Sequence, residues 1–325
     1  MTARAGFDRI PVIDAGPLAG GDEAAMRETA GAMRAASETA GFFCIANQGV
    51  PEEVQQAALR ASRDFFARPL AEKRRVAVDA LHRGYIEMGE ATLEDGADSD
   101  RKESFVWGLE LGPDDPDVAA GKPLMGPKRW PGDMPEMRAA LYGWYEAVGT
   151  CARNVLKGLA VGLGLPADYF APRFAKPLAR GSLVRYPPHP ADAGPRTFGT
   201  AAHTDYGGIT LVWQDGSGGL EVENRAGDWV PVHPVPGTLV VNIGDLMARW
   251  TNDVFASNPH RVINRSGRER YSMALFFDPD YDTRIETLPT CLAPGEAPRH
   301  PPTACGDYIR ERFDAVFRYR AAGAG

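Results

Sequence analysis

Helical periodicity dominates the first half of the chain. Over residues 22–40 the apolar side chains Met26, Ala30 and Met33 recur at three- and four-residue steps. That spacing puts them on one face of a helix, so it predicts a helix with a single stripe facing the core. The segment "GFFCIANQGVP" that follows predicts a short buried strand running into a turn. A second helix is expected to open at Pro51, because proline is favoured at the first helical position.

A longer helix is predicted over residues 135–165, where the apolar side chains keep helical spacing. Asp133 and Glu136 have the spacing of a capping pair, and Pro135 suits the first turn. A final helix is predicted over residues 307–319. The apolar stripes of both helices are expected to pack in the core.

From Ser182 the pattern changes to short β-prone runs separated by Gly, Pro, Asn and Asp. The runs read "SLVRYP", "GITLVWQ", "GLEVE", "DWVPV", "GTLVVNIGD", "HRVIN" and "RYSMALFF". No helical segment separates them, which favours an antiparallel sandwich or barrel over a parallel α/β sheet. The sequence shows no internal repeat and no flexible linker between independent domains.

Composition and charge narrow the class of protein. The 325 residues are 44% hydrophobic and 24% charged with a net charge of -7, as in a globular protein. Basic residues form no block and are not interleaved with aromatic ones, which argues against a nucleic-acid partner. No window approaches the roughly 18 consecutive apolar residues of a membrane helix, and the N-terminus lacks the apolar segment of a signal peptide. We therefore expect no membrane partner.

The cysteines favour a reducing compartment. They form no CxxC pair and are more typical of buried free thiols than of a disulfide framework. A cytoplasmic location is the resulting expectation. The four cysteines are Cys44, Cys151, Cys291 and Cys305.

Two polar side chains interrupt the apolar segment "GTAAHTDYGGITLVW", namely His203 and Asp205. Side chains at i and i+2 leave the same face of a strand, so we expect the imidazole and the carboxylate to share one space. A buried carboxylate is costly unless it is paired or bound to a metal, and this pair needs a third ligand to hold a divalent ion. A lone His-x-Asp is also common by chance, so the pattern alone is weak.

Three later histidines are candidates for the third ligand. His233 and His300 lie in proline-rich segments that read as exposed, whereas His260 starts the predicted strand "HRVIN". Two histidines and one carboxylate form the facial triad of non-heme Fe(II) oxygenases, which leaves three metal positions open. His260 is therefore the expected partner.

Arg270 and Ser272 strengthen the metal hypothesis. They fall at i and i+2 of the predicted strand "RYSMALFF", so they share a face. A guanidinium beside a hydroxyl is a good clamp for a carboxylate. The alternative, a surface arginine on a strand, is commoner for any single arginine.

These motifs together resemble a known family. "HTD" with a distal "HRV" and "RYS" is similar to the 2-oxoglutarate- and Fe(II)-dependent oxygenases, in the branch that includes isopenicillin N synthase and the plant hormone and flavonoid oxygenases. Further family segments are "IPVIDAGPL", "KESFVWG", "VRYPP" and "WTNDVFASNPHRVIN", so the resemblance covers nearly the whole chain. Gln48 departs from the family, which usually has a histidine there that is not a metal ligand.

The resemblance implies roles for six side chains. As iron ligands it implies His203, Asp205 and His260. As the clamp on the distal carboxylate of 2-oxoglutarate it implies Arg270 and Ser272, with a further hydrogen bond from Tyr186.

The resemblance also implies the fold. We expect a mainly β protein with α-helices, whose core is a distorted double-stranded β-helix, or jelly roll, flanked by N-terminal and C-terminal helices. The expected division is a helical N-terminal region over residues 1–175, the oxygenase core over residues 176–290, and a C-terminal segment with a helix over residues 291–325.

The implied activity is oxidation of an unactivated C–H bond of a small molecule, by hydroxylation or desaturation. Fe(II) is the implied cofactor, with 2-oxoglutarate and O₂ as cosubstrates and succinate and CO₂ as products. Two alternatives stay open: an isopenicillin N synthase-like oxidase that does not use 2-oxoglutarate, and a non-catalytic jelly-roll protein that holds a metal. The primary substrate and the oligomeric state are not readable from the sequence.

Five further side chains carry weaker expectations. Asn242 is expected to shape a turn, and Phe276 and Phe277 are expected to pack in the core. Arg83 and Tyr85 are expected to have packing or surface roles, although family specificity is expected in their segment, "HRGYIEMGEATLEDG", and in the C-terminal helix.

Overall fold

A long mixed sheet forms the centre of the protein. The computed structural model describes residues 6–90, 100–190, 192–194 and 196–317. Within this part of the chain the sheet has eight strands in the order β1-β2-β10-β7-β12-β5-β4-β3. Its strands are β1 (Val12–Asp14), β2 (Phe42–Ala46), β3 (Gly84–Ile86), β4 (Glu103–Gly108), β5 (Arg180–Tyr186), β7 (Ile209–Gln214), β10 (Leu239–Ile243) and β12 (Arg270–Phe277). The pairing is antiparallel except between β1 and β2.

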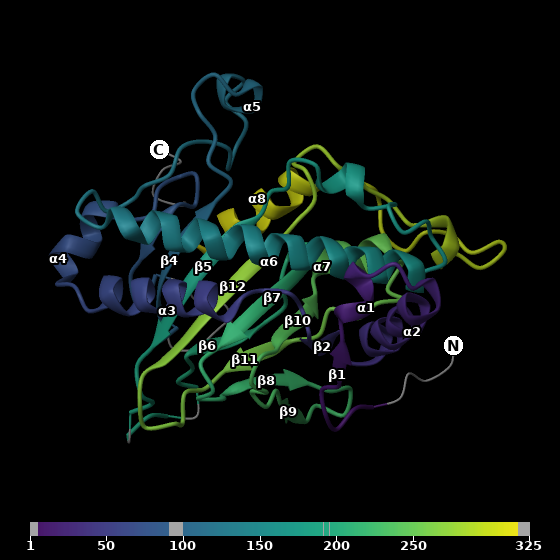
Figure 1. Ribbon diagram of the computed structural model, residues 1–325, viewed down its shortest axis with the longest axis horizontal. Helices are drawn as coiled ribbons and strands as arrows, with labels where there is room; N and C mark the ends of the chain where they lie inside the picture. Colours follow the sequence, from purple (N-terminus) through teal and green to yellow (C-terminus); the bar gives the residue numbers. More distant parts are fainter. Residues whose placement is uncertain (1–5, 91–99, 191, 195, 318–325) are drawn as a thin grey trace.

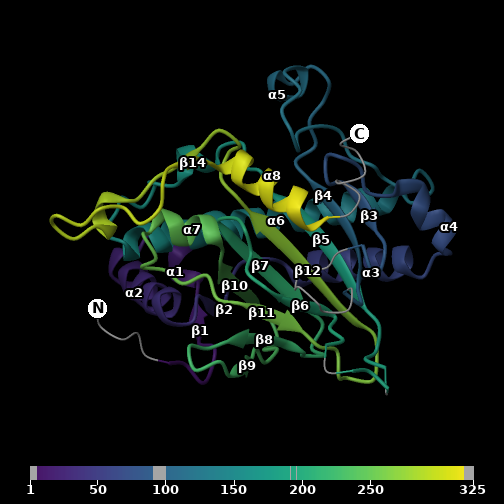
Figure 2. The same ribbon diagram turned by 180° about the vertical axis from the view of Figure 1, so that it is seen from behind.

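A smaller antiparallel sheet lies on the opposite side from the main helices (Figure 2). Its strands, in spatial order, are β6 (Thr200–His203), β11 (His260–Val262), β8 (Leu220–Glu223) and β9 (Trp229–Pro231). A third pair consists of β13 (Arg284–Ile285) and β14 (Thr303–Ala304). The predicted antiparallel architecture of the second half is therefore confirmed.

Helices cover the other face of the large sheet, where α6 runs across the strands with α2 and α3 beside it (Figure 1). The α-helices are α1 (Gly16–Ala19), α2 (Glu23–Thr39), α3 (Glu52–Phe66), α4 (Leu70–Lys73), α5 (Pro116–Ala119), α6 (Pro135–Gly162), α7 (Asp245–Trp250) and α8 (Cys305–Val316). Short 3₁₀ helices occupy η1 (Arg74–Val76), η2 (Ala171–Phe174) and η3 (Pro289–Cys291).

The predicted helices are confirmed in position, with differences at their ends. Asp22 caps α2 by accepting the N–H groups of the first turn, and Pro51 is the residue before α3 rather than its first residue. Asp133 does not cap α6, because its carboxylate pairs with Arg68 instead. The last helix ends at Val316, and residues 318 and 319 of the prediction lie outside the described residues.

Strand alternation divides the core into two layers. Odd-numbered residues of β12, such as Met273 and Leu275, pack toward α6, as does Phe277, whose ring stacks on Phe174. Even-numbered residues face the small sheet, where Val184 of β5 packs with apolar residues of both sheets. The space between the two sheets is thus a separate compartment from the main core.

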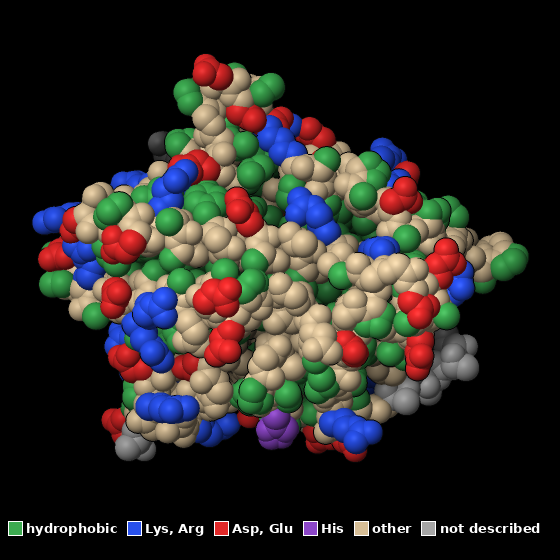
Figure 3. All heavy atoms as spheres, in the orientation of Figure 1, with side chains coloured by type: hydrophobic (Ala, Val, Ile, Leu, Met, Phe, Trp, Pro, Cys, Tyr) green, Lys and Arg blue, Asp and Glu red, His purple; other side chains and the backbone are tan. Residues whose placement is uncertain are grey.

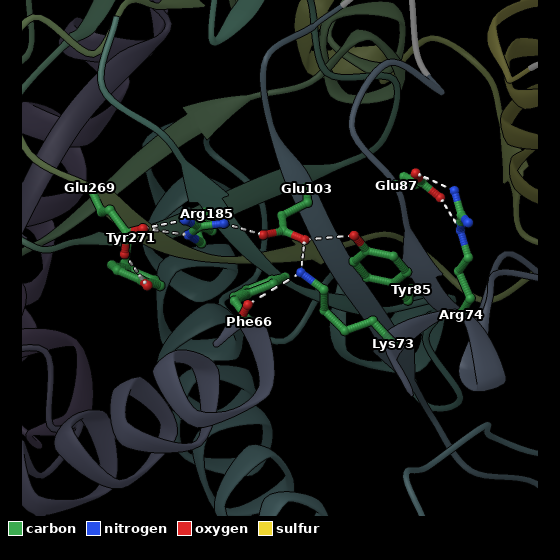
Figure 4. A network of polar contacts seen from close by, with 9 residues as sticks. All are labelled: Phe66, Lys73, Arg74, Tyr85, Glu87, Glu103, Arg185, Glu269 and Tyr271. Carbon is green, nitrogen blue, oxygen red and sulfur yellow. Dashed lines mark hydrogen bonds and ion pairs between the residues drawn. The ribbon is translucent and has the colours of Figure 1, made fainter. Parts of the chain in front are cut away.

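A buried polar network fixes the strands on the helix side of the large sheet (Figure 4). The carboxylate of Glu103 on β4 pairs with Lys73 at 2.6 Å and accepts a hydrogen bond from the Tyr85 hydroxyl at 2.6 Å. Arg185 of β5 donates to the same carboxylate and also pairs with Glu269. Because these contacts join β3, β4 and β5, they hold the register of the strands whose other face lines the inter-sheet space.

The outer surface mixes charges of both signs. Acidic and basic side chains are both scattered over the face covered by α3 and α6 (Figure 3). Exposed ion pairs between such side chains contribute little to stability, about 0–1 kcal/mol each. Among the described helices, none is long and apolar enough to cross a membrane.

Candidate active site

Strand pairing in the small sheet brings two predicted residues together. His203 at the end of β6 lies directly opposite His260 at the start of β11, with ring centroids 4.3 Å apart. The same-strand argument for Asp205 was wrong, because β6 ends at His203 and Asp205 belongs to the turn that leads into β7. The turn nevertheless directs the carboxylate back toward both imidazoles.

The three side chains form a compact cluster of potential metal ligands. The Nε2 atoms of His203 and His260 each lie 3.7 Å from Oδ1 of Asp205. One ligand atom from each residue lies within 4.8 Å of the others, as required around a single ion. A donor set of two imidazoles and one carboxylate suits Fe(II) and leaves open coordination positions.

Backbone carbonyl groups orient the two imidazoles. Nδ1 of His203 lies 2.9 Å from the carbonyl oxygen of Ala201, and Nδ1 of His260 lies 3.3 Å from that of Asn258. These contacts leave Nε2 of each ring facing Asp205. Burial and the neighbouring His260 lower the pKa of His203 to about 4, so its imidazole is neutral at pH 7 and has a lone pair for a metal.

The second oxygen of Asp205 is held by two strands of the large sheet. Oδ2 accepts hydrogen bonds from Thr210 Oγ1 at 2.5 Å and from Asn242 Nδ2 at 2.7 Å. Burial opposes ionisation, but the adjacent histidines and these hydrogen bonds outweigh it and lower the pKa of Asp205. The expectation for Asn242 was wrong, since it lies within β10 and contacts this carboxylate. A polar residue inside the apolar run "GTLVVNIGD" was the available signal.

The remaining candidate histidines lie elsewhere. His233 is exposed, as predicted from its proline-rich segment. His300 is only partly exposed and pairs with Asp253, with 2.8 Å between Nε2 and Oδ1. Gln48 accepts the N–H of Val50 and does not line the cavity that contains the three-residue cluster.

Arg270 and Ser272 line that cavity from β12, as the alternation predicted. Tyr186 lies directly opposite Arg270 on β5, and the Arg270 guanidinium lies 4.7 Å from the centre of its ring. Nε of Arg270 donates to the carbonyl oxygen of Gly218 at 2.7 Å, and Nη2 donates to Gln214 at 3.3 Å.

One nitrogen of the Arg270 guanidinium makes no hydrogen bond to the described residues. Nη1 is buried and has no hydrogen-bond partner among the described residues, and the whole residue is only 1% exposed. A buried guanidinium with a free donor is costly unless a ligand supplies an acceptor, so this end of the cavity fits a carboxylate.

The cavity lies between the two sheets, and all six predicted site residues line it. Phe276 also lines it, so the expectation of core packing was wrong for Phe276 and confirmed for Phe277. His82 and Phe317, which belong to neither sheet, also line the cavity, with ring centroids 4.7 Å apart. Arg83 is buried, as a packing role requires.

Two family descriptions match most of the chain. Residues 10–133 match the N-terminal region of the non-haem dioxygenases in morphine synthesis, and residues 179–279 match the 2OG-Fe(II) oxygenase superfamily. A 2-oxoglutarate-Fe(II) type oxidoreductase, hxnY of Emericella nidulans, is 38% identical over 312 residues, covering 93% of this chain and 89% of the relative.

Solved structures share the fold. A full-length Neurospora crassa protein, crystallised with alpha-KG and thymine, has a TM-score of 0.85 and 29% identity, covering 94% of this chain and 96% of that one. The rice dioxygenase for auxin oxidation has a TM-score of 0.73 and 28% identity, with coverage of 94% and 96%. The jelly-roll expectation is confirmed, and neither alternative, an oxidase without 2-oxoglutarate or a non-catalytic protein, is supported. The chain belongs to the 2-oxoglutarate- and Fe(II)-dependent oxygenases and is a dioxygenase that uses Fe(II), 2-oxoglutarate and O₂.

Proposed function

We propose that His203, Asp205 and His260 are the ligands of the catalytic Fe(II). The observation that carries this proposal is the convergence of both Nε2 atoms on Oδ1 of Asp205, each at 3.7 Å, while Oδ2 is already occupied by Thr210 and Asn242. Each ligand therefore has one atom free for metal and another atom fixed by the protein, an arrangement typical of metal sites.

We propose that Arg270, Ser272 and Tyr186 bind the distal carboxylate of 2-oxoglutarate. The buried, unpartnered Nη1 of Arg270 supports the assignment, because a carboxylate supplies the acceptor that this donor lacks among the described residues. Ser272 lies beside Arg270 on the same face of β12, and Tyr186 faces Arg270 across the strand pair.

The proposed reaction is hydroxylation or desaturation at an unactivated C–H bond of a small molecule, with release of succinate and CO₂. Bound Fe(II) supplies the redox chemistry that couples loss of CO₂ from 2-oxoglutarate to oxidation of the substrate by O₂. The protein side chains position both organic molecules, and the apolar walls of the inter-sheet cavity exclude water. The Neurospora crassa structure holds thymine with alpha-KG, which supports a small-molecule substrate here.

The three-part division of the chain is also a proposal: residues 1–175, the core 176–290, and 291–325. The large sheet crosses the first boundary, since β1 to β4 come from the N-terminal part, so these parts would fold as one unit. We propose a cytoplasmic location because the four cysteines are free and buried.

Ligand binding under anaerobic conditions tests the site. Fe(II) and 2-oxoglutarate added together should give wild-type protein a weak visible charge-transfer band. His203→Ala and Asp205→Ala should lack the band, because each loses a metal ligand. Arg270→Ala should keep it but need about 10- to 100-fold more 2-oxoglutarate, since it loses charge-assisted hydrogen bonds.

Two controls make the result interpretable. Arg265→Ala removes an exposed arginine that pairs with Glu221 outside the cavity, so it should titrate like wild type. Circular dichroism of each variant checks that it is folded. A band that persists in Asp205→Ala, or an Arg270→Ala titration that matches wild type, would contradict the assignment.

A further inference from the structure

A second buried arginine lines the cavity. Arg180 begins β5, at the opposite end of that strand from Tyr186, and is 4% exposed. Its Nη2 forms an ion pair with Asp278 Oδ2 at 2.9 Å. Its Nη1 is buried and has no hydrogen-bond partner in the described part of the chain. A donor left in this state is costly unless a ligand supplies an acceptor.

The surroundings of Arg180 favour a negatively charged acceptor. Arg83 lies close to it, since a side-chain carbon at Gly108, which is opposite Arg180, would lie 2.9 Å from the Arg83 guanidinium. Arg83 is buried, donates only to backbone carbonyl groups, and has no ion-pair partner among the described residues. Among the described residues, Arg180 thus has one carboxylate partner and Arg83 has none.

The sheet register places Arg180 level with the proposed metal site. Arg180 is opposite Phe276 of β12, Phe276 is opposite Thr210 of β7, and Thr210 is opposite Asn242 of β10. Thr210 and Asn242 are the residues that hold Asp205. With neighbouring strands about 4.8 Å apart, the backbones at Arg180 and Thr210 are separated by roughly 10 Å. A small molecule held at Arg180 therefore lies beside the metal ligands.

The position of Arg180 is fixed through Asp278. Oδ1 of Asp278 accepts the N–H of Gly208 at 2.9 Å, and a side-chain carbon at Gly207 would lie 1.5 Å from the same oxygen. The carboxylate therefore fits against the turn that follows Asp205, in space that only glycine leaves open. The guanidinium is held before any ligand arrives, which reduces the cost of binding.

Several aromatic rings lie near this end of the cavity. The Arg180 guanidinium lies 5.4 Å from the ring centre of Phe276 and 4.7 Å from that of Phe313. His82 and Phe317 add two further rings at the cavity wall. One cationic donor in an aromatic pocket matches a ligand with one anionic group and an apolar body.

We propose that the primary substrate is a small carboxylic acid with an apolar body, and that Nη1 of Arg180 binds its carboxylate. This inference rests on the proposed function of the cavity. The cosubstrate is assigned to the other end, at Arg270 and Tyr186. Because β5 has seven residues, its two ends are roughly 20 Å apart, so one cavity holds two separate carboxylate sites.

Matched acids and amides test the charge requirement. The full-length protein, loaded with Mn(II) and saturating 2-oxoglutarate, is titrated by calorimetry with phenylacetate, hexanoate and their primary amides. We expect each acid to bind at least about 10-fold more tightly than its amide, because only the acid forms a charge-assisted hydrogen bond with the guanidinium.

Variants at the arginine separate ligand binding from a structural role. Arg180→Lys keeps a positive partner for Asp278 but loses the second guanidinium nitrogen, which points in a fixed direction, so acid affinity should fall about 10-fold or more. The double variant Arg180→Met/Asp278→Leu removes both charges together and should bind acid and amide equally. Arg185→Lys, on the opposite face of β5, is the matched control and should bind the acids like wild type.

The outcomes are distinct. Equal binding of acid and amide to wild type, no binding of either acid, or wild-type acid affinity in Arg180→Lys would each overturn the proposal. The anaerobic charge-transfer band is measured on separate aliquots of the same protein preparations, loaded with Fe(II) and 2-oxoglutarate in place of Mn(II). A normal band with failed acid binding rejects this inference alone, whereas a missing band in wild-type protein rejects the proposed function.

Discussion

At Asp205 the two carboxylate oxygens have separate tasks. Oδ1 faces the imidazoles of His203 and His260, whereas Oδ2 accepts hydrogen bonds from Thr210 and Asn242. The hydrogen bonds restrict rotation of the carboxylate, so Oδ1 keeps its direction in the absence of metal. These two hydrogen bonds explain why the apolar strands β7 and β10 each carry a buried polar residue at this point.

Replacement of Asn242 by leucine should weaken metal binding. Asn242→Leu conserves approximate volume but removes one of the two donors to Asp205, so the affinity for Fe(II) should fall about 10- to 100-fold. Anaerobic metal titration, followed through the charge-transfer band at saturating 2-oxoglutarate, measures the change. Asn154→Leu on α6, outside the cavity, is the control and should titrate like wild type. Equal metal affinity in the two variants would show that the Asn242 contact is dispensable.

The alternation of side chains between the two faces of a strand determines which residues line the site. On β12, even-numbered residues from Arg270 to Phe276 line the cavity, and odd-numbered Met273 and Leu275 pack toward α6. On β5 the cavity face carries Arg180 and the opposite face carries Arg185, so the two arginines of one strand serve different purposes. The Glu103 network fixes β4 against β5 from the face behind the cavity (Figure 4).

Loss of the Glu103 carboxylate should destabilise the fold. Glu103→Leu leaves Lys73 buried without its partner and removes the acceptor for the Tyr85 hydroxyl. Breaking a buried pair from one side costs about 3–5 kcal/mol. Urea unfolding measures the change in the free energy of unfolding.

The double variant Glu103→Leu/Lys73→Met removes both charges and should recover most of that loss, since a neutral pair needs no compensation. Glu286→Leu breaks an exposed pair with Arg284 and should cost less than about 1 kcal/mol. If Glu103→Leu were no more costly than Glu286→Leu, the network would have no structural role.

At the scale of the whole molecule, the ligands are expected to join parts of the chain that are distant in sequence. Metal bound by His203, Asp205 and His260 would bridge the small sheet to the turn that is fixed on the large sheet. Bound 2-oxoglutarate would contact β5 and β12, next to the same inter-sheet space. Ligand binding should therefore stabilise the entire fold.

Mn(II) with 2-oxoglutarate should raise the thermal midpoint of the protein. At ligand concentrations about 100-fold above the dissociation constant the gain is about 2.7 kcal/mol, which corresponds to a rise of roughly 3–6 °C. Differential scanning fluorimetry with and without a chelator measures it. Asp205→Ala should show no response to Mn(II), and an equal rise in that variant would mean that the metal binds elsewhere.

Local patterns in the sequence determined where the helices and strands lie and which side chains share a face of each. Helical spacing located α2 and α6, and the two-residue period of "RYSMALFF" correctly put Arg270 and Ser272 on one face. Such features depend on neighbours within a few residues, so the sequence displays them directly. The family motifs are also short stretches of sequence, and the resemblance that they carry implied the use of Fe(II) and 2-oxoglutarate.

Only the tertiary structure decided which distant residues meet. Nothing local in the sequence pairs Asn242 with Asp205 or leaves Arg180 with a buried, unshared donor, because those relations depend on strand register and on contacts between sheets. The turn that carries Asp205 was likewise misread as strand, since tertiary hydrogen bonds rather than strand geometry direct its carboxylate. Strand registers and turn conformations depend on interactions between distant parts of the chain, and no short stretch of sequence contains that information.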